Sequence, residues 1–171
     1  MKFHCSALRL GQVWGTPLIP ILALTFAAEV SHAQSRKPTA EEIAAIHDCV
    51  DKNKDDLDQG ERRCLFNLVA DPCIGDVASA ADRKMADCYE IEGFIWYDLL
   101  NENFKRLLDT LDSEQRAKAR AMQRTWIAYR DTTCQFYYDK IQGSMAAHMR
   151  AACVIRESAR QAMLLGFFRQ L

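Results

Sequence analysis

Apolar residues recur every three or four positions along most of this chain, which is the spacing that places them on one face of an α-helix. The longest such stretch runs from about residue 79 to 111. A second begins at Asp112, which has a capping-box partner in Gln115, and contains neither Gly nor Pro up to Cys134. A third follows Ser144, the expected N-cap of the last helix. The pattern predicts three long helices.

Two shorter helical patterns precede the long ones. Thr39 and Glu42 form a capping box at the start of the first, and Asp58 and Glu61 are expected to cap the second. No stretch shows the alternation of apolar and polar residues that a half-buried strand requires. The sequence therefore predicts an all-α fold, a small helical bundle of three longer helices with two short N-terminal helices packed on them.

The second long helix carries a stripe of large side chains. The stripe consists of Met122, Trp126, Tyr129, Thr133 and Phe136. Large aromatic residues are usually buried, so this stripe is expected to face the core of the bundle. The turn that joins this helix to the preceding one is short, which predicts that the two helices lie antiparallel.

The first 33 residues have the features of a secretory signal peptide. Lys2 and Arg9 precede an apolar run at 17–28, and the small residues Ser31 and Ala33 predict cleavage after Ala33. The run is too short for a comfortable membrane span, and no later stretch of the sequence is long enough either. We therefore expect a periplasmic or secreted protein without a membrane anchor.

Charge gives little support to several classes of partner. Removal of residues 1–33 leaves 20 Lys and Arg against 22 Asp and Glu, so the net charge is about −2. This balance does not favour nucleic-acid binding, which depends on a concentrated basic surface.

After the predicted signal peptide, the chain is expected to comprise a Cys-containing short-helix region at 34–72 and a helical domain at 73–171.

No catalytic, cofactor-binding or metal-binding residues are predicted. Only His47 and His148 follow residue 33, and they are far apart in sequence, so a His-rich metal site is not expected. The segment that begins at Asp51 resembles an EF-hand loop, but Asp56 stands where Gly is needed and Arg62 where Glu is needed. The sequence also contains no C-x-x-C or G-x-S-x-G motif. We therefore do not expect an enzyme.

Six cysteines follow the predicted signal peptide. They are Cys49, Cys64, Cys73, Cys88, Cys134 and Cys153. An even number in an exported chain predicts three disulfides, formed in an oxidising compartment. Six cysteines permit about fifteen pairings, and the spacing alone does not choose among them.

The second long helix also carries a specific motif. It reads Gln123-Arg124-x-Trp126-x-x-Tyr129-Arg130-Asp131-x-x-Cys134. This motif resembles the signature of the LprI-type lysozyme inhibitor domain. The upstream segment of that family is matched at Cys88, Glu92, Trp96, Leu100 and Asn101. Tyr97 and Phe104 depart from it, and further on Ser158 and Gln161 stand where the family has Thr and Arg. The resemblance covers about residues 73–165.

The resemblance implies one of the disulfides. It favours a bond between Cys134 and Cys153, which would tie the motif helix to the last helix. Two compact arrangements then remain open for the other four cysteines. These are Cys49 with Cys64 and Cys73 with Cys88, or Cys49 with Cys88 and Cys64 with Cys73.

The resemblance further implies a protein that binds lysozyme and blocks the hydrolysis of peptidoglycan. An alternative is a cell-envelope structural or partner-binding helical module that does not act on lysozyme. Lysozyme holds two catalytic carboxylates in its cleft, and the connection between the last two helices offers cations and a hydroxyl group that complement them. The residues expected to bind the partner are Lys140, Gly143, Ser144, His148 and Arg150.

Overall fold

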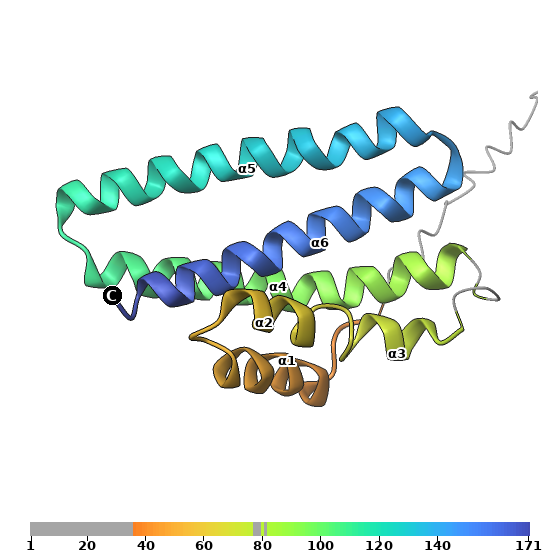
Figure 1. Cartoon of the computed structure of the whole chain (residues 1–171), viewed down its shortest axis with the longest axis horizontal. Helices are drawn as coiled ribbons and strands as arrows, with labels where there is room; N and C mark the ends of the chain where they lie inside the picture. The colour runs from red at the N-terminus through yellow and green to blue at the C-terminus, as the bar shows by residue number, and fades with distance from the viewer. Residues whose placement is uncertain (1–35, 77–79, 81) are drawn as a thin grey trace, which may run out of the picture. The chain divides into compact units, whose positions relative to one another are not determined.

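The computed structural model describes residues 36–76, 80 and 82–171, and the predicted signal peptide lies outside them. All regular elements in the described part are helices, which confirms the all-α prediction (Figure 1). They are α1 (Ala40–Lys52), α2 (Leu57–Cys64), α3 (Ala70–Ile74), α4 (Asp82–Thr110), α5 (Ser113–Ile141) and α6 (Gly143–Phe168). The three long helices are those expected from the pattern. No helix within the described residues is long and apolar enough to cross a membrane.

Side-chain caps set the starts of three helices. The Thr39 hydroxyl accepts from the Glu42 N–H at 3.2 Å, and Asp112 accepts from the Gln115 N–H at 2.8 Å, so both predicted capping boxes are confirmed. The cap of α2 is Asp56, whose carboxylate accepts from the Gln59 N–H, and not the expected Asp58 or Glu61. Asp56 is preferred because it precedes the first helical turn with an extended backbone.

The second short helix, which was expected to stop before Pro72, already ends at Cys64 as α2, and a separate short helix, α3, contains Pro72. The break lies at Leu65, which is extended, and at Phe66, which has a positive φ of 66°. Pro72 lies in the first turn of α3. Backbone N–H groups there have no acceptor within the helix, so proline, which lacks the N–H, is tolerated. The periodicity of the apolar residues continues across the break, so it did not reveal the division.

Helix α6 packs against both α4 and α5 (Figure 1). It runs parallel to α4, because Asp82 lies near His148 while Asn103 donates to the carbonyl of Ala162. It runs antiparallel to α5, in which Cys134 is bonded to Cys153. Helices α4 and α5 are sequence neighbours but make at most slight contact with each other. Most of α5 therefore depends on α6 alone for its packing.

The main core lies where α4 and α6 meet the short N-terminal helices. Trp96 of α4 is fully buried at its centre, together with Leu165 of α6. Ile46 and Val69 enter the same core from the N-terminal region. On the surface of that region Arg36 binds Glu42 and lowers the pKa of its carboxyl to about 2.

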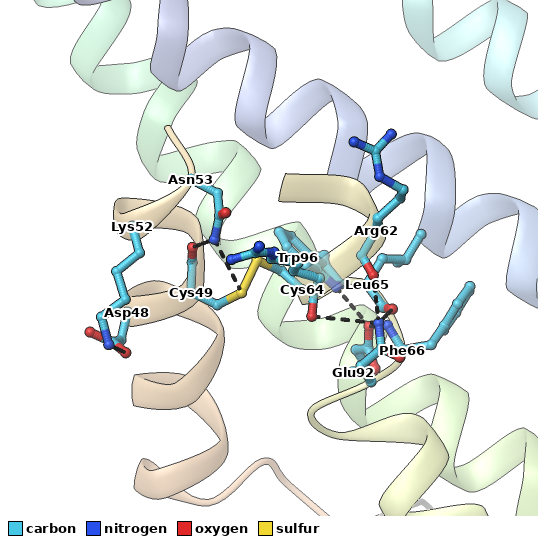
Figure 2. The surroundings of a disulfide bond; sticks show 12 residues. Asp48, Cys49, Lys52, Asn53, Arg62, Cys64, Leu65, Phe66, Glu92 and Trp96 are labelled. Atoms are coloured by element: carbon cyan, nitrogen blue, oxygen red, sulfur yellow. Dashed lines mark hydrogen bonds and ion pairs between the residues drawn. A yellow bond between two sulfur atoms is a disulfide. The ribbon is translucent and has the colours of Figure 1, made fainter. Parts of the chain in front are cut away.

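The carboxylate of Glu92 joins α4 to the break between α2 and α3. It is fully buried and accepts hydrogen bonds from the backbone N–H groups of Phe66 at 2.7 Å and Ala70 at 2.9 Å. The indole N–H of Trp96 donates to it as well, at 2.9 Å (Figure 2). Burial raises the pKa of Glu92 in spite of these bonds. Two residues of the family motif thus hold the N-terminal helices in place.

Three disulfides are present, as the cysteine count predicted. They join Cys49 to Cys64, Cys73 to Cys88 and Cys134 to Cys153. The first ties α1 to α2 beside the buried Trp96 (Figure 2), and the second ties α3 to α4. The structure thereby selects one of the two arrangements that the sequence left open.

Candidate partner-binding site

The connection between α5 and α6 forms a tight, exposed hairpin end, which we call the hairpin tip and define as residues 136–150. A single residue, Gln142, separates the two helices and has a positive φ of 59°. Gly143 follows with a φ of 76°, a conformation that glycine adopts without strain. Ser144 lies inside the first turn of α6, so it is not the N-cap that the sequence predicted. The N-cap is Gln142, because the chain reverses within this one residue. Its side chain makes no capping hydrogen bond.

Two cross-links hold the hairpin tip rigid. The disulfide between Cys134 and Cys153 lies at its base, where the two Cα atoms are 5.5 Å apart. Closing a loop of this length stabilises the folded chain by about 3 kcal/mol. The guanidinium group of Arg150 also donates to the amide oxygen of Gln135 at 3.2 Å. A tip held in this way loses little conformational entropy when a partner binds.

The surface of the hairpin tip is unusually apolar for an exposed turn. Its large exposed side chains are Phe136 (65% exposed), Tyr138, Ile141, Met145 (56% exposed) and Met149. These side chains lie at one end of the hairpin, where their exposed apolar surface is available to contact a partner. The sequence did not indicate that most of these residues are exposed, because a helical spacing of apolar side chains normally indicates a buried face. Only their closeness to the polar turn at 142–144 hinted at exposure.

Four of the five predicted binding residues are exposed at this tip, and one is not. Lys140, Gly143, Ser144 and Arg150 are exposed, as a contact surface requires. His148 is only 8% exposed, with Nε2 at 3.4 Å from a carboxylate oxygen of Asp82 and no hydrogen bond to either ring nitrogen. Its ring lies toward α4 because position 148 falls on the face of α6 that packs there. In this conformation His148 does not present its ring to a partner.

The charge of the described helices is unevenly distributed. Helix α5 carries six Lys and Arg against three Asp and Glu, and α6 carries three against one. Helix α4 has the opposite balance, with four against seven. The net charge of the chain is near zero because a basic hairpin, formed by α5 and α6, is offset by acidic residues in the other helices.

The stripe expected to face the core is only partly buried. Met122, Trp126 and Thr133 are half-buried, but Tyr129 is 53% exposed and Phe136 is exposed as well. The reason is that α5 has a single long neighbour, α6, so that a narrow arc of its surface is covered. The residues buried on α5 are Ala119, Gln123 and Cys134.

The motif residues of α5 have distinct surroundings. The amide of Gln123 accepts a buried hydrogen bond at 2.9 Å from Gln161, the residue that stands where the family has Arg. Arg130 lies over the ring of Trp126, at 5.0 Å from its centroid, and binds the carboxylate of its neighbour Asp131. Arg124 and Tyr129 are exposed.

The motif residues of α4 are mainly structural. Leu100 is buried in the main core with Glu92 and Trp96, while Asn101 is exposed. Within the described residues, no cluster of three or more His, Cys, Asp or Glu side chains is placed to hold a metal ion.

Comparison with known proteins gives one family match. The family model described as Lysozyme inhibitor LprI matches residues 73–165. No curated protein and no solved structure matches the chain. The matched region contains α4, α5, the hairpin tip and nearly all of α6. The chain belongs to the LprI family of lysozyme inhibitors.

Proposed function

We propose that this protein is an extracytoplasmic inhibitor that binds lysozyme and blocks the hydrolysis of peptidoglycan. The observation that carries the proposal is the family match over residues 73–165. Three disulfides agree with an oxidising compartment outside the cytoplasm, which the signal peptide expected at 1–33 would allow the chain to reach. The protein acts as a binding partner and not as an enzyme.

We further propose that the hairpin tip enters the cleft of lysozyme. A projecting helical turn fits a concave site, and the disulfide at its base keeps its shape. Lys140 and Arg150 supply positive charge toward the two catalytic carboxylates of the cleft, and Ser144 supplies a hydroxyl group. The exposed Phe136 and Met145 supply the apolar contact that dominates the affinity of most interfaces.

The test is inhibition of lysozyme acting on suspended cell walls. The oxidised mature chain is expected to slow lysis, and the triple change Lys140→Ala, Ser144→Ala and Arg150→Ala is expected to weaken inhibition at least about tenfold, which corresponds to about 1.4 kcal/mol. The matched control changes Lys105 and Arg169 to Ala. These exposed cations lie near the C-terminal ends of α4 and α6, far from the hairpin tip. This control is expected to inhibit as the wild type does.

Two results would contradict the proposal in different ways. Failure of the helical, fully oxidised protein to inhibit any of several lysozyme types would exclude the inhibitory function and favour a cell-envelope module. Undiminished inhibition by the triple variant would retain the function but exclude the hairpin tip as the contact surface.

A further inference from the structure

Helix α5 has a long exposed face, away from the hairpin tip's turn, that no other part of the described chain covers. Only three of its 29 residues are buried, all on the side toward α6. We call the exposed face the α5 seam. It consists of Ala117, Arg120, Arg124, Ile127, Asp131 and Tyr138, all of which are exposed. From Ala117 to Asp131 they follow one another at intervals of three or four positions, the spacing by which two helices pack side by side. The next position of that series, Cys134, is buried and bonded to α6, and Tyr138 continues the seam beyond it.

The α5 seam is complementary to the same seam of a second copy that runs in the opposite direction. The first half is basic, with Arg120 and Arg124, whereas the second half contains Asp131. Ile127, which is 40% exposed, lies at the centre. When a second α5 lies antiparallel about a point between Ile127 and Ala128, Arg124 faces the partner's Asp131, and the small Ala117 faces the partner's Tyr138. A two-fold axis repeats each of these contacts, as in most homodimers.

The charged groups of the α5 seam are free to make these contacts. Neither Arg120 nor Arg124 has a hydrogen bond or ion pair within the described residues. Arg130 of the same chain donates to Asp131, but both of its bonds, at 2.9 and 2.7 Å, end on Oδ1. The other oxygen, Oδ2, remains able to accept from an arginine of a second copy. The same carboxylate can thus bind one arginine from each chain.

The direction of pairing follows from the same charges. A parallel pair of seams in register would bring Arg120 and Arg124 against their own copies and Asp131 against its copy. Like charges placed opposite one another on paired helices are destabilising. The antiparallel arrangement replaces each of these repulsions with an attraction or a neutral contact. A partner with an unrelated sequence has no reason to match the order of this seam.

We propose that the α5 seam joins two copies of this chain as an antiparallel, two-fold helix pair centred near Ile127. The helix is about 43 Å long at 1.5 Å per residue, so the contact is a narrow one at the lower end of interface sizes. The dimer therefore forms and dissociates with protein concentration. Tyr138 is the one residue that the α5 seam shares with the hairpin tip, whereas Lys140, Ser144 and Arg150 lie outside the seam, so this proposal does not depend on the lysozyme-inhibitor function.

Sedimentation velocity over a concentration series tests the proposal with two charge reversals. The oxidised mature wild type is expected to show a monomer–dimer equilibrium. Arg124→Glu places two carboxylates together at each contact, and Asp131→Arg places two arginines together, so each variant alone is expected to dimerise at least about tenfold more weakly. An equimolar mixture of the two variants is expected to form a heterodimer, because every contact then pairs opposite charges.

The double variant Arg124→Glu with Asp131→Arg provides a second readout, since its exchanged charges attract across the two-fold axis and should restore dimers. Lys118→Glu serves as the matched control, because Lys118 is exposed on another face of α5 and should leave the equilibrium unchanged. Circular dichroism confirms that each variant is folded. A wild type that stays monomeric at all concentrations overturns the proposal. So does a mixture that associates no better than its components.

Discussion

At the scale of single residues, Glu92 makes the connection on which the N-terminal helices depend. Its carboxylate accepts three hydrogen bonds in a fully buried position. In Glu92→Gln one oxygen becomes an amide N–H₂ group, which cannot accept from a backbone N–H. At least one buried donor is then left without a partner, and the free energy of unfolding should fall by about 2 kcal/mol. Chemical denaturation measures this loss, and Glu90→Gln, an exposed change on the same helix, should stay within about 0.5 kcal/mol of the wild type.

The loss caused by Glu92→Gln should also depend on pH. Burial raises the pKa of Glu92 above its ordinary value of 4.5, so the folded chain binds this proton more tightly than the unfolded chain does. The contribution of this tighter proton binding to the free energy of unfolding is therefore fully present below pH 4.5, and it is lost as pH rises through the raised pKa. The destabilisation by Glu92→Gln should be larger near pH 4.5 than at neutral pH. Equal losses at the two pH values would show that the pKa is not raised.

At the scale of elements, a buried amide pair joins α5 to α6. Gln161 donates to Gln123 at 2.9 Å, and both residues are at least nine-tenths buried. Gln123→Leu leaves the Gln161 amide without its acceptor and should lower stability by about 1–3 kcal/mol. Adding Gln161→Leu removes the unsatisfied donor as well and should recover most of that loss. Denaturation of the two single variants and the double variant gives the coupling energy, and strictly additive losses would contradict the pairing.

At the scale of the whole molecule, the family match begins at Cys73, but the main core begins earlier in the chain. Ile46 and Val69 fill that core from the N-terminal side, and Glu92 takes two of its three hydrogen bonds from residues before position 73. A fragment of residues 73–171 should therefore lack cooperative unfolding and the near-ultraviolet circular dichroism of the mature chain. The mature chain should unfold in a single transition at which both circular-dichroism regions change together. Cooperative unfolding of the fragment would show that the matched region is independently stable.

Several features of the fold follow from local sequence. The long helices and the capping boxes of α1 and α5 were predictable because helical periodicity and capping boxes act over three or four residues. Three disulfides followed from the number of cysteines, and the resemblance implied the bond between Cys134 and Cys153. The family itself was predictable from the motif that ends at Cys134. At the site, the exposure of Lys140, Ser144 and Arg150 agrees with the position of a short turn between two helices.

Other features depended on which helices meet in space. The sequence by itself determined where helices form, because this depends on nearby residues. Only the tertiary structure decided that α6, and not α4, is the neighbour of α5, and therefore that Tyr129 and Phe136 are exposed whereas His148 is buried. The same holds for the pairing of the four N-terminal cysteines and for the three bonds to Glu92. An apolar stripe on a helix specifies a face to be covered, but it does not specify which helix covers it, because burial is roughly proportional to area and has no direction.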